Sequence, residues 1–203
     1  MKTRLWSVCA LVLSLAFFSG CAKPPAEAIE AARQALESAK AAQASEYAPR
    51  SLANAETAKS TLEAELKAQE DKFALFRSYK KATEMATAAK AAADQTVQDA
   101  NTAKEQARRE SEALIGQVRA AIDEAKQMLA SAPRGKGSQM DIKALEADIA
   151  STEASLAEVE RTYGEGAYLR AKAKAQATLQ SVNNIKSTIT AAIEMRKQAM
   201  GQR

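Results

Sequence analysis

Apolar side chains recur every three or four residues along most of this chain, which is the spacing of one face of an α-helix. The longest run starts at Leu75 and passes through Tyr79, Ala82, Ala86, Ala89, Ala93, Thr96, Ala100, Ala103 and Ala107. The alternation continues in a displaced phase at Leu114, Val118, Ala121, Ala125 and Met128. A phase shift of this kind locally unwinds a coiled coil without ending the helix. The pattern therefore predicts one helix over residues 75–131, about 85 Å long at 1.5 Å per residue.

Prolines and glycines indicate where the other predicted helices begin and end. A first helix follows Pro24-Pro25 and should stop near Tyr47-Ala48-Pro49, because proline disfavours helix in the residue before it. A second helix carries Leu52, Ala55, Leu62, Leu66 and Phe73. A proline and two glycines predict a loop over 132–138, and Gly164-Glu165-Gly166 separates the last two helices. Their seams are Ile142, Leu145, Ile149, Thr152, Leu156, Val159 and Tyr163, then Tyr168, Ala171, Ala175, Thr178, Val182, Ile185, Ile189 and Ala192.

Composition narrows the fold class to all-α. Alanine supplies 48 residues, about half of the apolar content, and it is mixed with Glu, Lys, Gln, Arg and Leu, the strongest helix formers. Because alanine buries little surface, a globule with one large core is not expected. The prediction is an elongated antiparallel helical bundle or coiled coil.

The chain also shows signs of an internal duplication. Two turns of the same sequence, Ala48-Pro49-Arg50 and Ala132-Pro133-Arg134, lie 84 residues apart, and the spacing Tyr79-x-x-Ala82-x-x-x-Ala86 returns from Tyr168. We therefore expect two tandem three-helix units that share one long central helix, with residues 21–110 in the first and 111–203 in the second. The first unit should turn near residues 70–77, where the second turns at its glycines.

Beyond residue 20, the six aromatic side chains all flank predicted turns. They are Tyr47, Phe73, Phe76, Tyr79, Tyr163 and Tyr168. One interpretation is a platform for a ligand. The preferred one is that alanine seams bring helices close, so that the wider hairpin ends need large side chains to fill them.

The first 20 residues have the three parts of a secretory leader. Lys2 and Arg4 are basic, about 13 residues from Trp6 to Phe18 are apolar, and Ser19-Gly20 are small. The apolar run is too short to span a bilayer and fits a signal peptide. The segment Phe18-Ser19-Gly20-Cys21 resembles the lipobox of bacterial lipoproteins, although Phe18 replaces the usual leucine. This resemblance implies cleavage before Cys21 and lipidation of Cys21.

Charge and missing residue types argue against most other functions. Loss of Lys2 and Arg4 leaves 27 basic and 25 acidic residues, well mixed along the helices, so nucleic acid is not an expected partner. The chain contains no histidine, the commonest general base and metal ligand, and Cys21 is its only cysteine after the leader. We expect no enzyme activity, no catalytic residues, no metal site and no cofactor.

The segment Cys21-Ala22-Lys23-Pro24-Pro25, the later Glu46-Tyr47-Ala48-Pro49-x-x-Leu52 and Tyr79-x-x-Ala82 resemble an uncharacterised family of alanine-rich bacterial lipoproteins, defined by domain of unknown function 4398. The similarity covers residues 21–110. It implies a helical bundle in the Gram-negative envelope and supplies no activity. Ala22 in place of Asp implies, by the sorting rule of enteric bacteria, the outer rather than the inner membrane.

Two functions follow from these expectations. The first is a lipid-anchored periplasmic rod that acts as a spacer, scaffold or envelope-stabilising element. The second is an accessory protein that docks a helical hairpin onto an envelope or transport complex. Full burial of every seam would favour the first, and an unpaired seam the second. An envelope protein or peptidoglycan stays open as a partner, although the chain ends in Gln202-Arg203 and lacks the terminal lysine through which the Braun-type lipoprotein is joined to the cell wall. An oligomer stays open, because alanine seams can close within or between chains.

Overall fold

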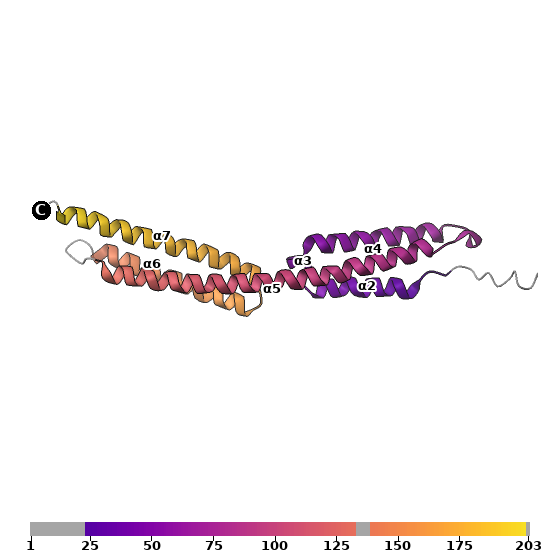
Figure 1. Ribbon diagram of the computed structural model, residues 1–203, viewed down its shortest axis with the longest axis horizontal. Helices are drawn as coiled ribbons and strands as arrows, with labels where there is room; N and C mark the ends of the chain where they lie inside the picture. Colours follow the sequence, from indigo (N-terminus) through magenta and orange to yellow (C-terminus); the bar gives the residue numbers. More distant parts are fainter. Residues whose placement is uncertain (1–22, 133–138, 202–203) are drawn as a thin grey trace, which may run out of the picture. The chain divides into compact units, whose positions relative to one another are not determined.

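The computed structural model describes residues 23–132 and 139–201, and within these ranges it contains helices and no strand (Figure 1). The helices are α2 (Ala26–Ala41), α3 (Ala44–Tyr47), α4 (Pro49–Glu70), α5 (Lys80–Ser131), α6 (Gln139–Gly164) and α7 (Tyr168–Gly201), with a 3₁₀ turn, η2, at Ala74–Phe76. The predicted all-α helical bundle is confirmed. The leader, Cys21 and most of the loop expected at 132–138 lie outside the described residues.

The chain divides into two compact units, Met1–Thr102 and Ala103–Arg203, and the division falls inside the 52-residue helix α5. Unit 1 contains α2, α3, α4 and the first part of α5. Unit 2 contains the rest of α5 with α6 and α7. One long helix therefore belongs to both units, and the expected boundary at residues 110 and 111 lies further along the same helix.

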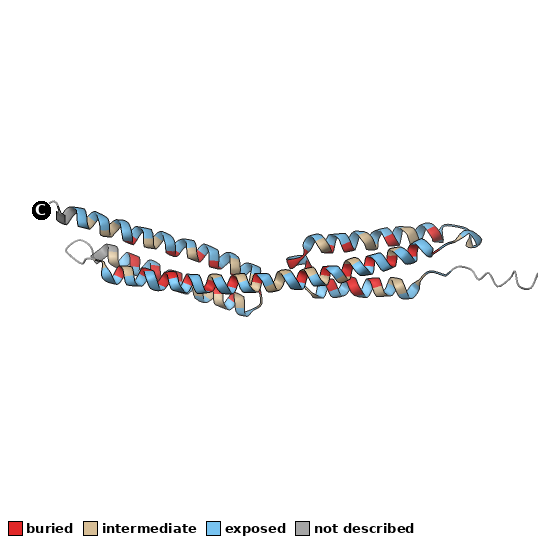
Figure 2. Ribbon diagram, viewed as in Figure 1, coloured by how far each residue is buried: buried red, intermediate tan, exposed pale blue. Residues whose placement is uncertain are grey.

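Alanine forms most of the packing surface in unit 1. The alternation predicted from Tyr79 onward is buried in α5, with Ala82, Ala86, Ala93, Thr96 and Ala100 at 0–1% exposure. The buried positions of α2 and α4 also form one stripe on each helix (Figure 2): Ala32, Ala35, Leu36, Ala39, Leu52, Ala55 and Leu62. Small side chains every third or fourth residue allow helix backbones to approach closely, so that unit 1 gains its stability from many small contacts.

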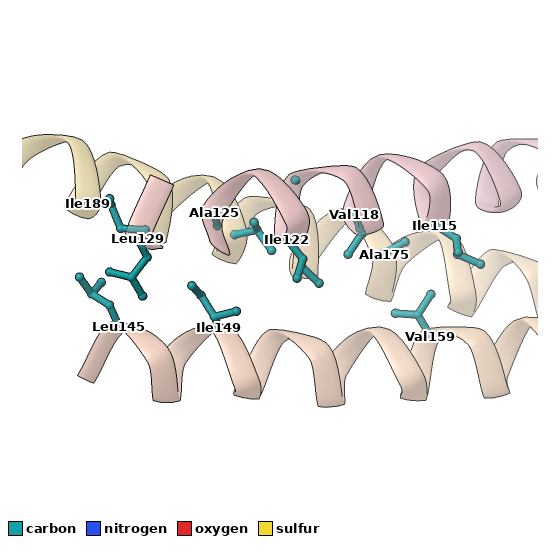
Figure 3. Packing of buried hydrophobic residues seen from close by; sticks show 12 residues of the cluster. Ile115, Val118, Ile122, Ala125, Leu129, Leu145, Ile149, Val159, Ala175 and Ile189 are labelled. Atoms are coloured by element: carbon teal, nitrogen blue, oxygen red, sulfur yellow. The ribbon is translucent and has the colours of Figure 1, made fainter. Parts of the chain in front are cut away.

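Unit 2 has a more conventional core of larger side chains. Figure 3 shows Val118, Ile122 and Leu129 of α5 facing Leu145 and Ile149 of α6, with residues of α7 beside them. The predicted seam named Leu114 and Met128, which are half-buried, and omitted the buried Ile115, Ile122 and Leu129. A helix that contacts two neighbours buries a wider face than the two-position seam of a coiled coil, which explains the difference.

The end of the first helix was predicted too late. α2 ends at Ala41, and Gln43 has a left-handed backbone (φ 60°) that turns the chain into the short helix α3. Pro49 then occupies the first turn of α4, where its missing N–H costs nothing. The predicted stop near Tyr47-Ala48-Pro49 is thus the second of two breaks.

The turn expected near residues 70–77 is confirmed, but its consequences for the neighbouring helices were predicted wrongly. α4 ends at Glu70 and α5 begins at Lys80, so Phe73 belongs to neither helix. Leu75, predicted to open the long seam, is 78% exposed. The three-four spacing that joins Leu75 to Tyr79 is therefore not helical periodicity.

The aromatic side chains divide into two groups. Tyr47 and Tyr79 are buried, as expected for residues that fill hairpin ends, and the rings of Tyr163 and Tyr168 lie 5.3 Å apart. Phe73 and Phe76 contradict the preferred interpretation, because they are 69% and 75% exposed.

The alanine seam can be tested with one enlarged side chain. Ala86→Leu should lower the stability of the protein by about 1–3 kcal/mol, because Ala86 is fully buried and the added carbons force helices apart. Ala88→Leu, two residues away on the exposed side of α5, is the matched control. Thermal unfolding followed by circular dichroism measures both. Equal midpoints for the two variants would contradict close packing at this seam.

Candidate functional site

The surface grooves of unit 2 lie between helices, and several of the side chains that line them have hydrogen-bond partners. The groove between α6 and α7 carries the hydroxyls of Thr152, Ser155, Thr178 and Ser181. Each of these hydroxyls donates a hydrogen bond of 2.7–3.1 Å to a backbone carbonyl of its own helix. Across the described residues, every buried polar side-chain atom has a hydrogen-bond partner. These four hydroxyls therefore already have partners within the protein.

A charged cluster lies where α5 meets the end of α6. The guanidinium of Arg108 donates to both carboxylate oxygens of Glu105 at 2.8 and 2.9 Å, and to the hydroxyl of Tyr163 at 3.3 Å. Arg109 donates to Glu105 at 2.8 Å as well. These two guanidinium groups hold the pKa of Glu105 at about 2. A carboxylate fixed in its charged form between two arginines is suited to an ion pair and not to proton transfer.

A second cluster joins α6 to α7. Glu158 accepts hydrogen bonds from Arg161 on its own helix at 2.7 and 2.9 Å, and from Lys174 on α7 at 2.6 Å. These partners lower the pKa of Glu158 to about 2. Lys174 also donates to the hydroxyl of Thr162 at 3.1 Å. The cluster fixes the register of the two helices.

Further ion pairs join helices within each unit: Lys81 with Glu65 in unit 1, and Arg119 with Glu160, Lys126 with Glu153, Lys172 with Glu110 and Lys186 with Glu124 in unit 2. At least one partner of each pair is substantially exposed, and such pairs contribute little to stability singly. Together these pairs favour one register of the helices, because a helix displaced by one turn along its neighbour would break several of them at once.

In the described part of the chain, no group of three or more acidic, cysteine or histidine side chains is positioned to hold a metal ion. None of the described helices combines the length and the apolar character needed to cross a membrane. The predicted lipidation site, Cys21, lies two positions before Lys23, the first described residue. The structure begins at Lys23 and becomes helical almost at once, where the Ile29 amide donates to the Pro25 carbonyl at 3.0 Å.

The most unusual surface is the connection between α4 and α5, here called the tip loop (residues 71–79). It exposes Phe73, Leu75 and Phe76, three of the five large apolar side chains that are exposed among the described residues. The rings of Phe73 and Phe76 lie 6.4 Å apart. The sequence pattern predicted that these side chains lie in helix seams or fill the wide ends of hairpins. The feature that indicates a different role is a group of three large apolar residues between charged ones, in a unit whose packing surface is mostly alanine.

Hydrogen bonds hold the tip loop in shape. The Arg77 guanidinium donates to the carbonyls of Glu70 at 2.8 Å and Lys72 at 3.0 Å. The buried side chain of Gln69 accepts through Oε1 from the Ser78 amide and from the Lys72 ammonium, both at 3.1 Å. The loop therefore presents its apolar side chains on a braced backbone.

Searches of family models, curated proteins and solved structures found no match to this chain. The resemblance to the family defined by domain of unknown function 4398 stays a prediction.

The bridge between α6 and α7 predicts a pH-dependent stability. Because the pKa of Glu158 falls from 4.5 to about 2 on folding, its charged form stabilises the protein above pH 4.5, and this contribution is lost as the pH falls from 4.5 towards 2. Glu158→Gln should lower the thermal midpoint at pH 7 and have little effect near pH 2. Glu146→Gln, at an exposed position of the same helix, is the control. A deficit of Glu158→Gln that persists at pH 2 would contradict this assignment.

Proposed function

We propose that the protein is a lipid-anchored envelope protein, held to the outer membrane through acylated Cys21, whose helices act as a periplasmic scaffold or spacer. Two features of the leader support the anchor. The basic start and short apolar run fit an export signal, and Phe18-Ser19-Gly20-Cys21 places a cysteine where bacterial lipoproteins are acylated. Two or more acyl chains give stable attachment, which one chain does not.

The burial of the seams carries the scaffold part of the proposal. In α2, α4, α5, α6 and α7 the three-four rows of apolar residues face their own unit. Leu36, Leu62, Val118, Val159 and Val182 are buried, and Leu114, Met128, Ile142, Leu156 and Ile185 are half-buried against the core of unit 2. A hairpin that docks onto another helical protein would need such a row on its surface. The geometry therefore favours the scaffold over the accessory docking protein.

The absence of catalysis is part of the same proposal and rests on residue types. The chain has no histidine, and its single cysteine after the leader is assigned to the lipid. The carboxylates Glu105 and Glu158 are committed to arginine and lysine partners. We therefore propose neither a substrate nor a cofactor.

The anchor can be tested with the two cysteines of the chain. Cells that express the wild type should incorporate an alkyne analogue of palmitate into the protein, and mass spectrometry should find the acyl groups on an N-terminal Cys21. Cys21→Ser should lose the label. Cys9→Ser should keep it, since Cys9 lies in the part of the leader that is removed. Label retained in Cys21→Ser would contradict acylation at this residue.

The scaffold role can be tested in cells that express the same variants. Deletion of the gene should increase leakage of periplasmic proteins, and the wild type and Cys9→Ser should restore retention while Cys21→Ser should not. Equal restoration by Cys21→Ser would show that the function does not need the anchor.

A further inference from the structure

We infer that the tip loop inserts into the same membrane that holds the lipid anchor, with Phe73, Leu75 and Phe76 entering the interface between headgroups and acyl chains. This inference rests on the proposed acylation of Cys21. The tip loop is then a binding site for lipid, and the end of unit 1 that carries it lies at the membrane.

The first observation is the exposure of the three side chains. Phe73, Leu75 and Phe76 are 69%, 78% and 75% exposed within nine residues, whereas Tyr79, at the end of the same loop, is buried. The packing of unit 1 therefore does not use them. Phenylalanine and leucine are the residue types that peripheral proteins bury at the boundary of headgroups and acyl chains.

The second observation is the position of the tip loop relative to the start of the described chain. Ala28 and Ile29, in the first turn of α2, pack against a cluster formed by Leu62 of α4 with Tyr79, Ala82 and Ala86, and Leu66 of α4 packs against the same cluster. Figure 1 shows the start of α2 and the α4–α5 connection at the same end of unit 1. The helical order of unit 1 thus brings together two segments that are about fifty residues apart in sequence.

The third observation is the short length of chain between the proposed anchor and unit 1. Pro24 follows Cys21 by three positions, and its carbonyl already accepts the Ala26 amide at 2.8 Å. An extended chain of three residues reaches at most about 11 Å. Acyl chains on Cys21 would therefore hold this end of unit 1 against the headgroups, where the tip loop meets the bilayer and not the open periplasm.

The charge of the tip loop suits the same surface. Residues 71–79 contain two basic side chains and one acidic one, a net charge of +1, and the basic Lys80 follows directly. Lys72 and Lys80 are exposed on either side of the apolar group, while Arg77 is turned inward onto backbone carbonyls. Basic side chains around an apolar group favour a bilayer that contains anionic lipid over a neutral one.

Tryptophan fluorescence gives a direct test, because Trp6 is the only tryptophan of the chain and lies in the leader. The acylated Phe76→Trp protein is purified from membranes and reconstituted into vesicles of phosphatidylethanolamine and phosphatidylglycerol. Its emission should shift to the blue when the protein is in vesicles, because the indole enters an apolar environment. The emission should also lose intensity when the lipids carry brominated acyl chains, which quench tryptophan. The control is Met195→Trp in α7, at a position with 65% exposure, whose emission should change little.

Two further variants separate insertion from anchoring. Phe73→Ser with Leu75→Ser, added to Phe76→Trp, should reduce the quenching, and Lys72→Gln with Lys80→Gln should reduce its dependence on phosphatidylglycerol. Acylation of Cys21 is measured by mass spectrometry on the same preparations. Acylated protein with no more quenching at Phe76→Trp than at Met195→Trp would overturn the insertion and leave the anchor intact.

Two other results would be equally clear. Quenching at Phe76→Trp in protein that lacks acyl groups would refute the anchor and keep the tip loop as a lipid-binding element. A blue-shifted emission in the absence of vesicles would overturn the inference, because it would place the tip loop against protein.

Discussion

Close packing through alanine is the constraint on which unit 1 depends. Ala82, Ala86, Ala93 and Ala100 are almost completely buried on one face of α5, and their small side chains allow neighbouring helices to pack closely. Alanine contributes little apolar area per residue, so the stability comes from the number of contacts and from the strong helix propensity of the same residue. The cost is intolerance of larger side chains in the seam. The benefit is that the order and direction of the helices are set with few large residues.

The order of the helices in unit 1 determines the position of the tip loop. Because α4 runs antiparallel to α2 and α5 runs back beside both, the start of α2 and the α4–α5 connection share one end of unit 1. The seams of unit 1 are mostly alanine, so the packing of this unit does not require three large apolar residues in one connection. Their exposure and their closeness to the proposed anchor are explained together if that end rests on a membrane. Unit 2 differs, since larger residues such as Ile122 and Leu145 form its core and ion pairs such as Glu158 with Lys174 set its register.

Periodicity was sufficient to predict the fold class, the long shared helix and most buried positions. It failed where tertiary contact or local geometry decides the outcome. Ile115 and Ile122 are buried because α5 contacts two helices in unit 2, and a single-face pattern does not contain that information. The break at Gln43 has no proline or glycine, and its left-handed backbone is a local solution that the spacing of apolar residues does not indicate. Phe73 and Leu75 continued an apparent helical row by coincidence. The pattern that predicted the helices therefore failed to predict the tip loop. Cys21 was predicted as a lipidation site only from the resemblance of its segment to the lipobox.

The seams of unit 1 close within one chain and bring the start of α2 to the tip loop. The most direct measurement is lysine crosslinking of the purified protein with a short amine-reactive reagent, on a mixture of chains labelled with nitrogen-14 and nitrogen-15. We expect links from Lys23 to Lys72 or Lys80 within single chains. We expect none from Lys40, which lies near the other end of α2, to Lys72 or Lys80. Links from Lys40 to Lys72, or Lys23 links found mainly between chains of different isotope, would contradict this arrangement.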